Sequence, residues 1–176
     1  MSVEQLNFSY NILKMEKTSP NVYLILGTEN SGRRKFLLDL ILELPETFRI
    51  LYFEDSHNQS NKEKEELLAL NSVECVDFKV ENRKIKHESI TCNPDKIFFI
   101  SSKYCDPSDM IESLGNWLIK NNCDITRIIT IANCELIENN KAIKEWTDAC
   151  IHFSDFTFLN RHNWANARWL NLWISE

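Results

Sequence analysis

Glycine is scarce in this sequence, and its few occurrences are unevenly placed. The chain has 176 residues but only three glycines, Gly27, Gly32 and Gly115. Two of the three lie in the short stretch GTENSGRRKF (27–36), directly after an apolar segment. Glycine adopts positive φ without strain and lets the backbone approach a ligand closely. The pair therefore marks residues 27–32 as the first candidate for a functional loop.

Long hydrophobic runs are also lacking. No apolar run approaches the roughly 18 residues that a membrane-spanning helix needs. The first residues, MSVEQLNFSYNILKMEK, mix polar and apolar types too closely for a signal peptide. Hydrophobic residues make up 43% of the chain and charged residues 26%, which is typical of a soluble globular protein. We therefore expect a cytoplasmic protein with no membrane partner.

The sequence has neither closely spaced cysteines nor an excess of positive charge. Its six cysteines include no C-x-x-C pair, so we expect six reduced, mostly buried thiols rather than a metal cluster. The net charge is -6, and an acidic surface repels a phosphate backbone. We therefore expect no nucleic-acid partner.

Short apolar segments alternate with segments of helical periodicity. We expect strands at 21–26, 48–53, 73–80, 96–100, 125–131 and 156–159, and helices at 33–44, 62–70, 107–121 and 141–151. Residues 54–61 include Glu54, Asp55 and His57 and are predicted to form a solvated loop, while residues 81–93 show no clear period. Such strands, separated by helices, favour a parallel sheet covered on both faces.

This alternation predicts an α/β fold: a three-layer α/β/α domain with a mostly parallel sheet. We expect one domain over residues 1–176, with an N-terminal arm at 1–20 and a tryptophan-rich tail at 164–176. Ligands of such sheets bind at the carboxyl ends of the strands. The glycine-containing loop follows one of these ends.

Four stretches carry further motifs. They are YLILGTENSGRRKFLL (23–38), KIFFISSKYCDPSDMIESL (96–114), IITIANCELI (128–137) and DACIHFSDFTFLNRHN (148–163). In this order they resemble the phosphate-binding loop, two later strand ends and the base-recognition segment of the CobW-like P-loop GTPases. That family is associated with metal insertion. The resemblance implies a P-loop NTPase-like fold, although the family's C-terminal domain and its Gly-Cys-x-Cys-Cys motif have no counterpart in this sequence.

The sequence departs from the family's pattern at the groups that carry its chemistry. Arg33 and Arg34 stand where the family has a phosphate-binding lysine and a Mg²⁺-binding Ser or Thr. Arg33 still supplies a cation, but Arg34 has only donors and cannot bind a metal ion. Ile100 replaces an acidic residue, and Lys103 replaces a glycine that faces the γ-phosphate. We therefore expect a degenerate GTPase that does not hydrolyse nucleotides, with no catalytic residue.

The base-recognition segment has changed as well. Arg161 replaces the family's lysine, and Asn163 replaces the aspartate that binds the guanine edge. Asparagine turns one donor toward a donor of the base, which costs about 1–3 kcal/mol. We expect guanine selectivity to fall by about tenfold or more.

The leading hypothesis is a non-hydrolysing binding or regulatory module. Its ligand would be GTP, GDP, phosphate or another phosphate-bearing small molecule, since a helix N-terminus attracts anions. The candidate binding residues are Gly27, Asn30, Ser31, Gly32, Arg33, Arg34, Asn160, Arg161 and Asn163.

One alternative to a ligand-binding module remains open. The loop is then an inherited turn without a ligand, and the protein is a structural interaction module with a protein partner or a second copy. Trp164, Trp169 and Trp173 in the tail would form that interface, or would instead cover the core.

Overall fold

The computed structural model describes residues 19–28, 30–58, 62–101, 105–162 and 167–175. Its strands are β1 (Asn21–Gly27), β2 (Ile50–Asp55), β3 (Val73–Glu81), β4 (Lys84–His87), β5 (Lys96–Ile100), β6 (Ile125–Asn133) and β7 (Phe156–Asn160). Within these ranges they form one seven-stranded sheet in the order β4-β3-β2-β5-β1-β6-β7. Every neighbouring pair is parallel except β3 and β4, which form an antiparallel hairpin.

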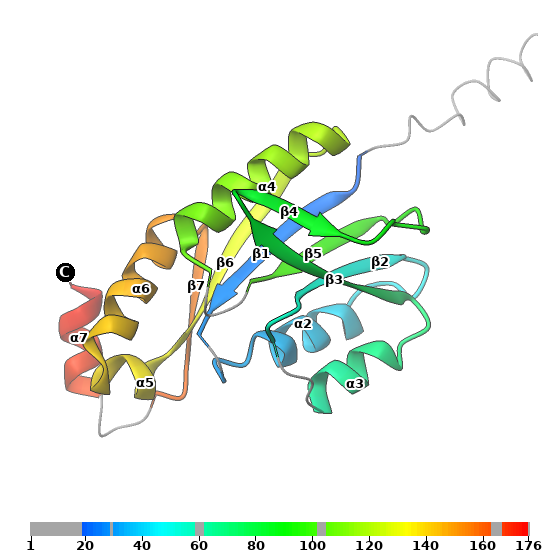
Figure 1. Cartoon of the computed structure of the whole chain (residues 1–176). Coiled ribbons are helices and arrows are strands. Elements are labelled where there is room, and N and C mark those ends of the chain that lie inside the picture. Colours follow the sequence, from blue (N-terminus) through cyan, green and yellow to red (C-terminus); the bar gives the residue numbers. More distant parts are fainter. Residues whose placement is uncertain (1–18, 29, 59–61, 102–104, 163–166, 176) are drawn as a thin grey trace, which may run out of the picture.

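Helices cover both faces of the sheet (Figure 1). They are α2 (Arg33–Leu42), α3 (Lys62–Leu68), α4 (Pro107–Asn121), α5 (Cys134–Asn139), α6 (Lys141–His152) and α7 (Ala167–Ile174). Because side chains alternate along a strand, Phe53 packs with Trp117 of α4, while Tyr52 packs with Leu37 of α2. Helices α4 and α6 thus lie on one face, and α2 and α3 on the other. The predicted three-layer α/β/α fold with a mostly parallel sheet is confirmed.

The end of β2 differs from the sequence-based expectation. The strand continues through Glu54 and Asp55, which are 0% and 2% exposed. The prediction of a solvated loop at these residues was wrong. Two carboxylates tolerate this burial because each has partners: Glu54 accepts from Arg34 and Asn58, and Asp55 accepts from the backbone and ring of His57.

Three elements had no counterpart in the expected set: β4, α5 and, in the tail, α7. Strand β4 lies in residues 81–93, and a turn at Asn82 and Arg83, both with positive φ, joins it to β3. Two-residue hairpin turns favour this conformation because it matches the twist of the strands. Helix α5 begins after Asn133, whose side chain accepts a hydrogen bond from Leu136 N.

The described part of the tryptophan-rich tail packs inward. In α7, Trp173 is buried beside Ala132 and Ile137, and its Nε1 donates to Asp148 Oδ1 at 2.8 Å. The Trp169 ring stacks on it with centroids 5.4 Å apart. Trp173 therefore covers the core, whereas Trp164 lies outside the described residues.

Two further expectations concern membranes and thiols. Among the described helices, none has the length and apolarity that a membrane crossing requires. All six cysteines are free thiols, and Cys134 and Cys150 are buried. Burial raises the pKa of Cys75 to about 11 and that of Cys105 to about 12, which makes both thiols poor nucleophiles at neutral pH.

Candidate anion site

Two glycines set the shape of the loop between β1 and α2. Gly27 has φ +148° and Gly32 has φ +92°, values that side chains rarely tolerate. A β-carbon on Gly27 would lie 2.5 Å from the carbonyl oxygen of Ile131. A β-carbon on Gly32 would lie 2.7 Å from Nδ2 of Asn160. Gly27 therefore requires glycine for space as well as for conformation, whereas at Gly32 the conformation requires glycine and a side chain would displace the Asn160 amide.

Side chains from the ends of β6 and β7 hold the loop by its carbonyl groups. Asn160 Nδ2 donates to Ser31 O at 2.8 Å. Asn133 Nδ2 and Arg161 Nε both donate to Asn30 O, at 3.2 and 3.1 Å. Asn160 and Arg161, predicted as base-recognition residues, are thus brought to the loop and contact its backbone. Asn163 lies outside the described residues.

Helix α2 begins directly after this loop without a side-chain cap. Its N-cap is Gly32, and its first turn contains no acidic residue. The first N–H groups of a helix have no partner within the helix, and its dipole places partial positive charge there. In α2 the chain adds two cations, Arg33 and Arg34, at this same end. Buried carboxylates at Glu54 and Asp55 balance these two cations, so the attraction for an anion comes from the uncapped end of the helix.

The two arginines point to different partners. Arg33 is buried and donates from Nη1 to the carbonyl of Ser101, just beyond β5. Burial lowers the pKa of Arg33 to about 10, a shift that Arg34 adds to and Glu54 opposes. Arg34 donates from Nε to Oε2 of Glu54 at 2.9 Å. Its side chain is 13% exposed, so this ion pair is largely shielded from water.

Several polar atoms around the loop are buried without a hydrogen-bond partner. Within the described structure they include Thr28 Oγ1, Ser31 Oγ, Ser101 Oγ and Arg34 Nη2. Ser31 and Ser101 are 1% exposed and Thr28 is 7% exposed. The Ser31 hydroxyl lies inside the loop, 2.9 Å from where a Gly27 β-carbon would be. Buried polar groups are nearly always bonded, so these four atoms are where a bound water or a ligand would find partners.

The other buried serine and threonine hydroxyls of the described residues are satisfied. Ser113 Oγ donates to Asp109 O, Thr147 Oγ1 donates to Ile143 O, and Thr130 Oγ1 bonds Ser154 Oγ. A fifth unpartnered atom, the hydroxyl of Tyr52, belongs to the middle of β2 rather than to the loop. The other four all come from the loop, the start of α2 or the end of β5.

The sequence-based list of site residues omitted Thr28, Glu54, Ser101 and Asn133. All four follow or end strands whose carboxyl ends meet at one edge of the sheet. In the register of β2 and β5, Glu54 lies opposite Ile100, directly before Ser101. Strand order, which a single sequence does not give, was the missing information.

No family model matches the sequence, and no curated protein matches it significantly. The resemblance to CobW-like GTPases therefore rests on the four stretches quoted above. In the described ranges, no group of three or more His, Cys, Asp or Glu residues is arranged to hold a metal ion.

Proposed function

We propose that this protein is a non-hydrolysing, P-loop-like binding or regulatory module that holds a phosphate-bearing small molecule in the loop at residues 27–34. A fully ionised phosphoryl group has no hydrogen-bond donor, and all its terminal oxygens accept. It therefore matches a loop that offers N–H groups, hydroxyls and a guanidinium. The observation that carries the proposal is the cluster of unpartnered atoms at Thr28, Ser31, Ser101 and Arg34.

The residues at the loop argue against phosphoryl transfer. Phosphoryl-transfer enzymes of the P-loop type hold Mg²⁺ with a Ser or Thr hydroxyl at the start of the helix. Here Arg34 occupies that position and is paired with Glu54. A guanidinium provides no lone pair for a metal ion. We therefore propose ligand binding without catalysis.

Thermal unfolding tests the proposal directly. The melting temperature would be measured with inorganic phosphate, GTP, GDP and ATP, each with Mg²⁺ and with EDTA. A ligand that binds the folded state raises the melting temperature by an amount set by its concentration and Kd. We expect an increase with at least one of them in EDTA. No increase with any ligand, or an increase that requires Mg²⁺, would contradict the proposal.

Two serine variants test the loop, and a third serine variant is their matched control. Ser31→Ala and Ser101→Ala remove hydroxyls that have no partner among the described residues, so we expect them to reduce the ligand-induced shift. Ser113→Ala removes a buried hydroxyl that is bonded within α4. It should lower the melting temperature without ligand and leave the ligand-induced shift unchanged.

The structure also contains an observation that favours the alternative, a protein interaction module. Strand β7 is at the edge of the sheet, and its Phe156 and Phe158 are 54% and 46% exposed. An exposed apolar edge strand is a template for pairing with another chain. The test is the sedimentation of wild type and Phe156→Lys over a range of concentrations. Self-association that the substitution abolishes would favour this second function.

A further inference from the structure

The pairing of Arg34 with Glu54 bears on which ligands the loop accepts, provided that the proposed function holds. Arg34 uses Nε for Glu54, while its Nη2 is buried and without a partner. Both carboxylate oxygens of Glu54 are occupied, Oε2 by Arg34 and Oε1 by Asn58 Nδ2. Arg34 thus offers the N–H groups of Nη2 to a ligand while it remains held by Glu54.

The buried charges at this edge of the sheet balance one another. Arg33 and Arg34 are the cations, and Glu54 and Asp55 are the carboxylates. Asp55 is engaged by His57 on the other face of the strand. Arg161 is the next cation, but it is exposed and lies 4.0 Å from Glu135.

A ligand that enters the loop therefore meets no surplus of buried positive charge. Its charge is compensated by the uncapped end of α2, which is equivalent to about half an elementary charge. Each further negative charge on the ligand is repelled by Glu54. At separations of several Å in a shielded site, we expect this repulsion to lower the affinity about tenfold or more. No Ser or Thr stands at the start of α2 to recruit a compensating metal ion.

We propose that Glu54 is a specificity-determining residue: by holding Arg34 through Nε and balancing its charge, it restricts the loop to a phosphoryl group of low charge that binds without a metal ion. Inorganic phosphate and a phosphate monoester fit this description. A nucleoside triphosphate does not, because its chain of phosphates brings several additional negative charges.

The test compares affinities along a series of ligand charge. Inorganic phosphate, AMP, ADP and ATP would be titrated in EDTA at constant ionic strength, by calorimetry, into wild type and Glu54→Gln. For wild type we expect affinity to stay level or fall from AMP to ATP. In Glu54→Gln we expect phosphate to bind about tenfold more tightly and ATP to gain more than phosphate, since a carboxylate has been removed. Glutamine fits the site because Asn58 can turn its amide to match.

Two further variants serve as controls. Glu145→Gln, in an exposed pair with Lys141 of α6, changes the net charge equally and should leave all four affinities unchanged. Glu54→Gln leaves Arg34 without its ion pair, so circular dichroism would verify its fold. The double variant Arg34→Gln/Glu54→Gln removes both charges of the ion pair. Folded proteins often tolerate the loss of a whole buried ion pair better than the loss of one partner. The double variant should bind phosphate about tenfold more weakly than wild type, because the Nη2 donor is gone.

The outcomes separate the two proposals. If wild type binds phosphate but Glu54→Gln shows the same ratio of ATP to phosphate affinity, the role of Glu54 is wrong and the proposed function stands. Phosphate binding that persists unchanged in the double variant would also contradict the role of Arg34. If wild type binds none of the four ligands, the proposed function itself fails.

Discussion

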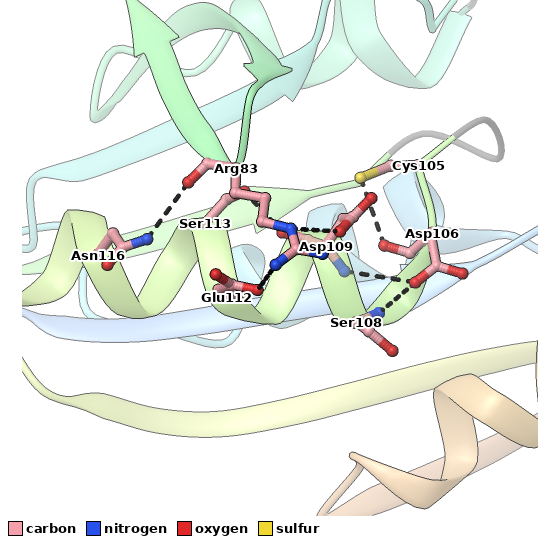
Figure 2. Close-up of polar contacts among 8 residues, drawn as sticks. All are labelled: Arg83, Cys105, Asp106, Ser108, Asp109, Glu112, Ser113 and Asn116. Atoms are coloured by element: carbon pink, nitrogen blue, oxygen red, sulfur yellow. Dashed lines mark hydrogen bonds and ion pairs between the residues drawn. The ribbon is translucent and has the colours of Figure 1, made fainter.

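Helices α4 and α2 begin at the same edge of the sheet, but their N-termini are capped differently. At α4 the Asp106 side chain accepts from the backbone N–H groups of Ser108 and Asp109, at 2.8 and 3.4 Å (Figure 2). Pro107 stands at its first position, where a missing N–H costs nothing. At α2 the N-cap is Gly32, and within the described residues this helix has no side-chain cap.

The difference shows which helix end is complete within the chain. Side chains also cap α5 and α6, through Asn133 and Asn140. Around α2 the hydroxyls of Ser31 and Ser101 are unpartnered as well, whereas Ser113 in α4 has its acceptor. The start of α4 is therefore complete within the chain, whereas the start of α2 is the end that we propose to bind an acceptor from outside the chain. Four sets of substitutions test whether the two helix ends differ in this way.

The largest effect is expected from alanine at Gly27, the last residue of β1. Gly27→Ala would place a β-carbon 2.5 Å from a backbone oxygen at φ +148°. We expect it to lower the free energy of unfolding by about 3 kcal/mol, the upper range for backbone strain. Gly115→Ala is its control, because nothing lies within 4 Å of that position in α4. It should raise stability by about 0.5–1 kcal/mol. Urea unfolding measures both, and a neutral Gly27→Ala would show that the loop is not held in this shape.

A second pair of substitutions exchanges the capping states. Asp106→Ala removes the cap of α4 and should cost about 1 kcal/mol. Gly32→Asp supplies a capping residue to α2, yet we expect a loss of about 2 kcal/mol, because its φ is +92° and its β-carbon would lie 2.7 Å from Asn160. Chemical denaturation checks both values. A gain in stability for Gly32→Asp would mean that α2 merely lacks a cap.

The buried hydroxyls provide a third and smaller contrast. Ser113→Ala breaks a hydrogen bond of 2.6 Å and should cost about 1 kcal/mol. Ser31→Ala and Ser101→Ala break none, so without ligand they should be neutral or should stabilise by a few tenths of a kcal/mol. The measurement is the free energy of unfolding without any phosphate in the buffer. Equal losses for all three serines would remove the distinction between the two helix ends.

The sequence predicted those parts of the molecule that depend on local pattern. The periodicity of Phe36 to Leu44 and the apolar run before Gly27 place β1, α2 and the loop between them. The two glycines indicate positive φ because few other residues accept it. The three-layer fold was predicted from the alternation of apolar strand segments with helical segments.

What the sequence did not predict depends on partners far apart in the chain. Glu54 is polar and follows an apolar run, so its pattern is that of a loop, and its burial depends on Arg34 across the gap between β2 and α2. The support of the loop by Asn133 depends on β6 lying beside β1. Whether a serine hydroxyl is bonded, as for Ser113, or unbonded, as for Ser31, has no signature in composition or spacing.

The smallest effect concerns the arginine–carboxylate pair at α4, the exposed counterpart of Arg34 and Glu54. Arg83, in the β3–β4 turn, pairs with Asp109 at 3.2 Å and Glu112 at 3.0 Å (Figure 2). All three side chains are well exposed, so Arg83→Ala should cost about 0.5 kcal/mol, and the difference should vanish in about 1 M salt. Asn116 still binds the carbonyl of residue 83, which keeps the hairpin on α4. Urea unfolding at low and high salt measures this. A larger loss in free energy of unfolding that salt does not reduce would show that the exposed pair at α4 is as strong as the shielded pair at α2. Burial of the ion pair would then not distinguish the two helix N-termini.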